Sequence, residues 1–336
     1  MAKLLLAPME GLADEILREL LTRVGGYDLA VSAFIRVSGT LLPARAFRRA
    51  VPELVCGSRT VAGTPVAVQL LGSDPACLAD NAAQVASLSP AGIDLNFGCP
   101  APTVNRHGGG ARLLTDPQKI YRIAAAVRRA VPEAIPFSAK MRLGLRDTRR
   151  TLDCAQALEA SGIGSLVVHA RTAAQGYRPP ADWEWIARIR DVVRVPVIAN
   201  GEVWTAEDHA RCRTVSGCSD VMIGRGAVAD PFLAQRIRAR AAGQAIADDP
   251  AGEWRQLQEL IGDYWQKVCA KVAARHAPGR LKLWLAALRR RFGGAEALFS
   301  AVRPLLSGDE VGEVLRRHGV PARPGESDGV RQLARP

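Results

Sequence analysis

Short apolar runs rich in β-branched residues recur along residues 4–224, and segments with helical spacing separate them. The runs predict eight strands, at 4–9, 29–34, 66–71, 93–97, 136–142, 165–170, 196–200 and 220–224. Intervening segments such as ILRELLTRV and IYRIAAAVRRAV repeat apolar residues every three or four positions, as one face of a helix does. Near-continuous apolar strands that alternate with helices indicate a parallel sheet covered on both faces.

Eight strand–helix units over about 240 residues predict an α/β fold of the (β/α)8 TIM-barrel type. The alternative is an open, doubly wound sheet, which usually carries a glycine-rich dinucleotide turn after its first strand. Here that turn reads PMEGLAD and lacks the GxGxxG pattern. The barrel is therefore the favoured fold.

Seven of the eight predicted strands end in residues that can take part in chemistry. A solvated strand end is the ordinary explanation for any single one of them. In a barrel, however, the carboxyl ends of all strands converge on one rim, where active sites lie, so the set predicts a site. Its members are Pro8-Met9-Glu10, Gln69, Asn96 with Cys99, Lys140 with Arg142, His169 with Arg171, Asn200-Gly201-Glu202 and Gly224-Arg225-Gly226.

The last two of these turns suggest a phosphate site. Their glycines allow backbone N–H groups to approach an anion, and Arg225 adds a charged side chain. Two plain glycine turns are the alternative. No Walker lysine motif occurs, so a phosphate-bearing cofactor on the rim fits better than a nucleoside triphosphate.

The chain beyond the barrel changes in character. We expect a barrel domain at 1–242, a linker at 243–252, a helical domain at 253–320 and a disordered tail at 321–336. Residues 264–303 contain nine Lys or Arg and one acid, and we call them the basic segment. Its Lys267, Lys271 and Arg275 are four apart, which predicts one shared helix face. An apolar face is predicted at Leu281, Trp284, Leu285, Leu288 and Phe292.

The basic segment has three possible meanings. A solvated surface is the usual one, but the acids that normally intersperse such a surface are missing. A membrane-binding helix is possible, although the apolar face is needed to pack a helical bundle. A helical module that follows a phosphate backbone accounts best for the lack of acids.

Composition narrows the class of protein further. Of 336 residues, 48% are hydrophobic, and the net charge is +12. No apolar run reaches the roughly 18 residues of a membrane span, and the opening MAKLLLAPMEG reads as a buried strand rather than a signal peptide. The seven cysteines form no CxxC pair, so we expect no metal site and reduced thiols in the cytoplasm. No feature signals oligomerisation, so we expect a monomer.

Six motifs now occur in order on six different strands: APMEG, DLNFGCPAPTV with GGGARLL, KMRLG, VVHARTAAQGY, VIANGE and MIGRGA. Together they resemble the tRNA-dihydrouridine synthases, flavin enzymes that reduce uridines in tRNA, over residues 3–305. The stretches SAFIRV and GRLKLWLAALRRRF resemble the bacterial C-type branch, which acts on uridine 16 of the D-loop. Phe97 departs from the family, which more often has a smaller residue there. It could narrow the pocket or point into the barrel wall.

The resemblance implies FMN as cofactor, NADPH (or NADH) as reductant and tRNA as partner. The reaction saturates the uracil C5=C6 bond, with a hydride from reduced FMN to C6 and a proton from Cys99 to C5. An ordinary thiol has a pKa of about 8.5 and is mostly protonated near pH 7, which suits a proton donor. Gly98 and Pro100 would direct the thiol, and the triple glycine at 108–110 would let the loop close over a base. A buried structural thiol is the alternative.

The resemblance also assigns binding roles on the rim. Lys140 is expected near the pyrimidine side of the flavin, where a cation favours the anionic reduced form. The flavin contacts it implies are Pro8, Met9, Glu10, Gln69, Lys140, His169, Asn200, Gly201, Glu202, Gly224 and Arg225. Asn96 and Tyr177 would contact the target uridine, and the residues that orient the tRNA would be Arg36, Arg280, Lys282 and Arg303.

Two other functions stay open at this point. A flavin barrel that reduces a free pyrimidine or an enone would not need the basic segment. A non-catalytic RNA-binding protein built on a barrel would need neither flavin nor Cys99.

Overall fold

A computed structural model describes residues 2–244 and 249–321, and its contacts divide the chain into two units. The first unit contains residues up to 227 together with 231–244. The second contains 228–230 and the described residues from 249 onwards. Among the described residues, no helix is both long and apolar enough to cross a membrane.

The first unit is a closed parallel β-barrel. Because β1 pairs with β2 and β9, and β2 also pairs with β4, the sheet closes on itself. β2 and β3 both pair with β4, so they form one of the eight barrel strands in two pieces, where one strand at 29–34 was predicted. The TIM-barrel prediction is therefore confirmed. The strands are β1 Leu4–Leu6, β2 Leu29–Val31, β3 Ile35–Arg36, β4 Val66–Leu71, β5 Ile93–Phe97, β6 Phe137–Arg142, β7 Ser165–His169, β8 Val197–Asn200 and β9 Val221–Ile223.

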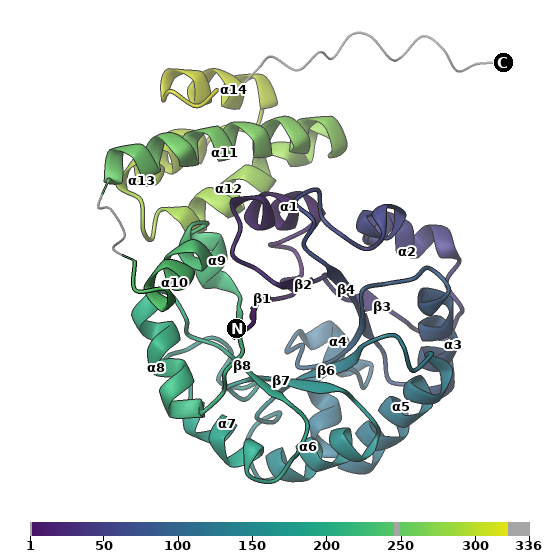
Figure 1. Ribbon diagram of the computed structural model, residues 1–336. Coiled ribbons are helices and arrows are strands. Elements are labelled where there is room, and N and C mark those ends of the chain that lie inside the picture. Colours follow the sequence, from purple (N-terminus) through teal and green to yellow (C-terminus); the bar gives the residue numbers. More distant parts are fainter. Residues whose placement is uncertain (1, 245–248, 322–336) are drawn as a thin grey trace, which may run out of the picture. The chain divides into compact units, whose positions relative to one another are not determined.

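Helices surround the ring of strands in Figure 1. Several begin at an acid whose side chain accepts a backbone N–H of the first turn, as Asp14, Asp74 and Asp116 do. The α-helices of this unit are α1 Glu15–Val24, α2 Ala44–Ala50, α3 Pro75–Ala86, α4 Pro102–Arg106, α5 Pro117–Ala130, α6 Thr151–Ala160, α7 Trp183–Arg190, α8 Ala206–Ser216, α9 Arg225–Ala229, which runs into 228–230, and α10 Leu233–Ala241. Short 3-10 helices lie at Pro52–Cys56 (η1) and Gly110–Thr115 (η2).

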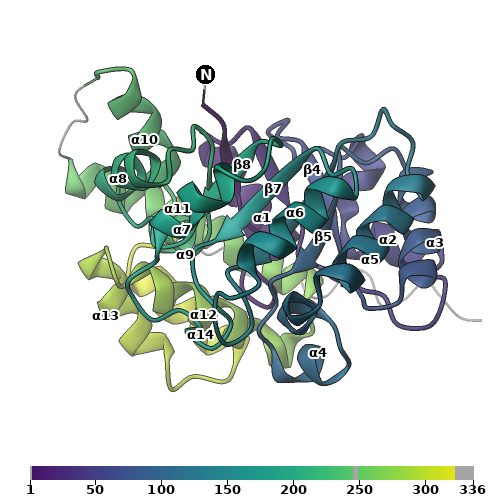
Figure 2. The same cartoon turned by 90° about the horizontal axis from the view of Figure 1, so that it is seen from below.

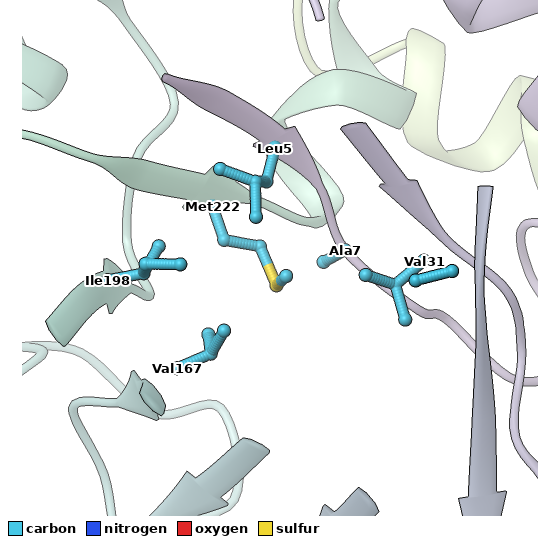
Figure 3. Packing of buried hydrophobic residues seen from close by; sticks show 7 residues of the cluster. Leu5, Ala7, Val31, Val167, Ile198 and Met222 are labelled. Carbon is cyan, nitrogen blue, oxygen red and sulfur yellow. The ribbon is translucent and has the colours of Figure 1, made fainter. Parts of the chain in front are cut away.

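The interior of the barrel has an apolar layer and a polar layer. Alternate strand residues point inward, because successive side chains of a strand face opposite sides. Toward the amino ends the inward side chains form the apolar cluster in Figure 3: Leu5, Ala7, Val31, Ala67, Val167, Ile198 and Met222. Two residues further along the strands, the inward positions are polar, as at Gln69, His169 and Asn200. In Figure 2, α4 lies at the end where β5 finishes, and the N-terminus lies at the opposite end.

The second unit is helical, as predicted. Its α11 (Pro250–Lys271), η3 (Ala274–His276), α12 (Ala277–Leu288), α13 (Gly293–Val302) and α14 (Gly308–Arg317) follow in order. The last three residues of the predicted linker already belong to α11, because Asp249 caps that helix and Pro250 occupies its first turn. Residues 245–248 of the linker and 322–336 of the predicted tail lie outside the described residues.

All five predicted apolar positions are buried, four of them in α12 and the fifth, Phe292, at the start of α13. Trp284 anchors this apolar face, since its ring packs edge-on against Tyr264 with centroids 4.8 Å apart and its indole N–H donates to the Val228 carbonyl. The predicted basic helix face is wrong at Arg275. α11 ends at Lys271, the next residues turn to extended backbone, and Arg275 lies in η3.

Candidate active site

A cavity of about 570 Å³ opens at the carboxyl ends of the barrel strands. It brings together fourteen of the predicted site residues: Pro8, Met9, Glu10, Gln69, Asn96, Cys99, Lys140, His169, Tyr177, Asn200, Gly201, Glu202, Gly224 and Arg225. The four residues expected to orient tRNA lie elsewhere in the structure. Arg36 is exposed in β3, and Arg280, Lys282 and Arg303 belong to the helical unit.

Cys99 is the thiol that borders the cavity. Partial burial raises its pKa above the ordinary value, and Glu10 acts in the same direction. The backbone N–H of Ala101 and the charges of Arg142 and Arg36 oppose that shift, the N–H most strongly. The thiol is therefore protonated at neutral pH, as a proton donor requires and a nucleophile does not.

The Cys99 loop is fixed from both sides. Its N–H donates to the Asn96 side-chain oxygen over 2.8 Å, and its carbonyl accepts the N–H of Ala111 at 3.0 Å. Gly110 has φ +59°, and a Cβ there would lie 2.6 Å from the Cys99 carbonyl oxygen. Only glycine fits this approach, so Gly110 serves close packing. That the loop closes over a base stays a prediction.

Below the thiol, polar side chains form a row across three adjacent strands. Gln69, Asp94 and Ser138 are register partners on β4, β5 and β6, so their side chains lie at one level. Gln69 donates its amide N–H to Asp94 at 2.7 Å, and Ser138 donates to the other carboxylate oxygen at 2.6 Å. The Asn96 amide donates to the Gln69 oxygen at 2.8 Å. This row forms part of the cavity floor through Gln69 and Asn96.

Positive charge is concentrated around the cavity. Burial lowers the pKa of Lys140 to about 8, and Arg142 adds to the shift while Asp94 opposes it. Burial, followed by the charges of Arg142, Lys140, Arg171 and Arg225, holds the pKa of His169 well below its ordinary value. His169 is therefore neutral at physiological pH and cannot be a proton donor there.

The loop after β8 is held in an uncommon conformation. Gly201 has φ +117° and Glu202 has φ +61°, which is rare for a residue with a side chain. A Cβ at Gly201 would lie 2.9 Å from the His169 ring. Glu202 forms an ion pair with the buried Arg171 and accepts a hydrogen bond from the Trp204 indole at 3.1 Å. These contacts direct the NGE turn into the cavity.

Two cationic side chains pack against Tyr177. The guanidinium carbons of Arg225 and Arg142 lie 4.2 and 5.3 Å from its ring centroid. Arg142 also donates to the Gly98 carbonyl at 2.9 Å and to the Gly176 carbonyl at 2.8 Å. It therefore ties the Cys99 loop to the loop that carries Tyr177.

Arg142 and Arg171 were among the strand ends predicted to form the site, but neither was given a binding or catalytic role. Both are buried and both border the cavity. The available signal was their position within the KMRLG and VVHARTAAQGY motifs. Phe97 is buried on the outward side of β5 with Ile93 and Leu95, which agrees with the barrel-wall reading.

The cavity's charge distribution shows what it can hold. Lys140, Arg142, Arg171 and Arg225 line it, whereas its acids are Glu10 and Glu202. Such a surplus of cations suits an anionic ligand. Among residues 2–244 and 249–321, no cluster of His, Cys, Asp and Glu has the make-up of a metal site.

The tRNA-orienting candidates of the basic segment differ in exposure. Arg303 is exposed and Arg280 is half-buried. Lys282 is half-buried and donates its ammonium to the Leu305 carbonyl within the same unit. Lys282 therefore has a structural role besides any role in binding.

The chain is similar to one protein family and to named members of it. The dihydrouridine synthase (Dus) family matches residues 5–292. The chain is 58% identical to the tRNA-dihydrouridine(16) synthase of Ralstonia nicotianae, over 93% of this chain and 94% of that one. It is 56% identical to the protein of the same name from Cupriavidus necator, over 94% of this chain and 97% of that one.

Solved structures with much lower identity share the fold. A 2-naphthoyl-CoA reductase complex matches with a TM-score of 0.52 and 11% identity, over 71% of this chain and 50% of that one. TcOYE with pHBA matches with a TM-score of 0.51 and 11% identity, over 71% of this chain and 89% of that one. At this level of identity the similarity concerns the fold alone.

Proposed function

Because the chain belongs to the dihydrouridine synthase family, we propose that it reduces a uridine of tRNA to 5,6-dihydrouridine, with FMN as cofactor and NADPH as reductant. The target is uridine 16 of the D-loop, in keeping with the relatives' names. The observation that carries the proposal is the position of the Cys99 thiol, whose pKa partial burial raises, in a barrel cavity with a cationic lining.

The residues present suit FMN. The GRG turn and Arg225 would hold its phosphate, Pro8, Met9 and Gln69 would border its ring, and Lys140 would place a positive charge beside it. The other contacts would come from Glu10, His169, Asn200, Gly201, Glu202 and Gly224. When bound, FMN supplies the hydride that uracil C6 accepts.

Cys99 completes the reduction. Its S–H bond breaks, the proton goes to uracil C5, and the sulfur keeps the electron pair as a thiolate. The Ala101 N–H and Arg142 stabilise that thiolate, since both lower the pKa of Cys99. A proton from solvent restores the thiol. His169 remains neutral and packs 6.0 Å from the Tyr177 ring, centroid to centroid.

Binding of the tRNA involves both units. The target base must leave its stack, as bases do in other base-modifying enzymes. Tyr177 and Asn96 would contact the base at the cavity, and Arg36, Arg280, Lys282 and Arg303 would orient the tRNA. In this proposal residues 1–242 are catalytic and 253–320 bind tRNA. We expect a cytoplasmic monomer without metal, which light scattering and metal analysis would test.

Nucleoside analysis of tRNA from a strain that lacks the gene, mapped by position, tests the function. Loss of dihydrouridine at position 16 alone supports enzyme, substrate and site together. Loss at another position keeps the chemistry and changes the target. If dihydrouridine persists at every position and no other enzyme covers the site, a free-pyrimidine or enone reductase becomes the better account. A protein that also purifies without flavin colour would instead be an RNA-binding protein.

A further inference from the structure

Asp94 lies beneath the cavity and does not border it, yet it is linked to Cys99 by side-chain hydrogen bonds. Asp94 accepts from the Gln69 amide, and the Gln69 oxygen accepts from Asn96. The Asn96 oxygen in turn accepts the N–H groups of Gly98 and Cys99, at 2.9 and 2.8 Å. We call Asp94, Gln69 and Asn96 the Asp94 chain.

The direction of every hydrogen bond in the Asp94 chain is determined by its two ends. Backbone N–H groups can only donate, so Asn96 must turn its oxygen toward Gly98 and Cys99. Its NH2 group then faces Gln69, so the side-chain oxygen of Gln69 must accept that hydrogen bond. The Gln69 NH2 group consequently needs an acceptor, and the carboxylate of Asp94 provides one. Ser138 donates to the second oxygen of Asp94 and leaves the first for Gln69.

We propose that Asp94 is a positioning residue for Cys99: as the acceptor at the end of the Asp94 chain, it fixes the orientation of both amides and thereby the backbone of the thiol. This inference rests on the proposed function, in which Cys99 is the proton donor. Without the Asp94 acceptor, the buried NH2 group of Gln69 has lost its partner, which favours rotation of the amide. A rotated Gln69 presents its NH2 to Asn96, and a rotated Asn96 presents NH2 to two N–H groups, which breaks the support of the loop.

The orientation also determines what the cavity offers a ligand. Each NH2 group in the Asp94 chain donates one N–H to its neighbour and has a second N–H that is not used within the chain. Both Gln69 and Asn96 border the cavity, so each has an N–H left to donate to a ligand there. A ring that carries carbonyl oxygens suits two such donors.

Two variants of Asp94 separate its acceptor role from its charge. Asp94→Leu keeps the branching at Cγ and has no acceptor. Asp94→Asn loses the charge but can turn its oxygen toward Gln69 and its NH2 toward the Ser138 hydroxyl. In the FMN-loaded full-length protein, we expect Asp94→Leu to speed amide hydrogen exchange at Gly98 and Cys99 by about tenfold, because a buried donor loses its partner. Dihydrouridine formation should slow by about the same factor, whereas Asp94→Asn stays within about threefold of the unmodified protein in both readings.

The two readings also distinguish a local effect from general damage. Amide exchange in α5 should be unchanged in Asp94→Leu, since no residue of α5 belongs to the Asp94 chain. Unchanged exchange at Gly98 and Cys99 in Asp94→Leu would overturn the proposal. Equal damage in Asp94→Asn and Asp94→Leu would also overturn it, because the charge would then be what matters.

A second pair keeps the test decisive if Asp94→Leu does not fold. Gln69→Glu places two buried carboxylates in contact, and their repulsion should displace the new side chain from Asn96, so exchange at Gly98 and Cys99 should rise. Adding Asp94→Asn restores a donor, because the new amide can donate to the new carboxylate, and that carboxylate still accepts from Asn96. Exchange should return toward that of the unmodified protein, and no recovery would count against the chain. These exchange readings hold even if the protein makes no dihydrouridine, which would refute the proposed function alone.

Discussion

At the scale of single residues, Cys99 differs from the other cysteines in the groups that surround its thiol. Cys154 and Cys212 are buried, and burial raises the pKa of each to about 12. Cys99 shares the upward direction but borders the cavity, where N–H and guanidinium groups can stabilise its thiolate. A thiol that is protonated at rest and supported after it loses its proton meets both requirements of a general acid.

Cys99→Ala should therefore remove proton delivery and leave the other steps in place. We expect dihydrouridine formation to fall by about 10²–10⁴-fold, the usual contribution of a general acid. FMN content and the rate of flavin reduction by NADPH should not change. Stopped-flow absorbance and nucleoside analysis measure the two halves separately. Cys56→Ala is the matched control, since Cys56 is exposed, and full product formation by Cys99→Ala would exclude the thiol from the mechanism.

At the scale of elements, the glycines of the GGG turn differ although the sequence makes them look equivalent. Gly108 and Gly110 both have positive φ, at +72° and +59°. A Cβ at Gly108 meets nothing within 4 Å, whereas a Cβ at Gly110 meets the Cys99 carbonyl. Backbone conformation is thus the only constraint at Gly108, and Gly110 has a packing constraint in addition.

Replacing each glycine by alanine measures this difference. Gly108→Ala should cost about 1–2 kcal/mol of unfolding free energy, the penalty of the left-handed conformation. Gly110→Ala should cost about 1–3 kcal/mol more through overpacking, and it should slow dihydrouridine formation because Cys99 moves. Urea unfolding and turnover measure both effects. Equal costs for the two variants would mean that the contact with Cys99 relaxes freely.

The elements also show how far the sequence could predict the structure. Near-continuous apolar runs followed by helical spacing were sufficient for the eight barrel strands, since both patterns are local. The break between β2 and β3 was missed, because both pieces pair with β4 and the interruption leaves no local mark. Arg275 was misplaced because spacing alone does not show that the helix ends at Lys271. The role of Asp94 needed the register of three strands, which no local pattern contains.

At the scale of the whole molecule, the net charge of +12 concerns binding rather than folding. Part of the basic segment has internal partners: Arg291 pairs with the buried Asp230 at 3.0 Å, and Lys282 donates to Leu305. Changing Lys282 would therefore disturb the helical unit as well as any tRNA contact. Arg303 is exposed and is the better probe.

Arg303→Glu should weaken tRNA binding and reduce the slope of log K against log salt by about one, the effect of losing one phosphate contact. Binding measured between low and high salt gives this slope. Arg129→Glu on α5 is the matched control, with the same change in charge at another exposed position. An equal effect of both variants would indicate attraction by overall charge, without a footprint on the basic segment.

The stability of the molecule should fall as the pH decreases, because two histidines are held neutral in the fold. Burial lowers the pKa of His209 to about 4 and that of His169 well below its ordinary value. The unfolded chain binds a proton at each near pH 6.5, so below that pH it holds more protons than the native state, and unfolding becomes easier. Between pH 6.5 and about 4, His209 should contribute a slope of at most about 1.4 kcal/mol per pH unit. Asp94 has the opposite effect on stability at acid pH, because its pKa is raised in the fold.

The variant His209→Gln isolates the effect of one histidine. Between pH 7 and pH 5, its free energy of unfolding, measured with urea, should fall less than that of the unmodified protein. An identical loss would mean that His209 takes up its proton without unfolding.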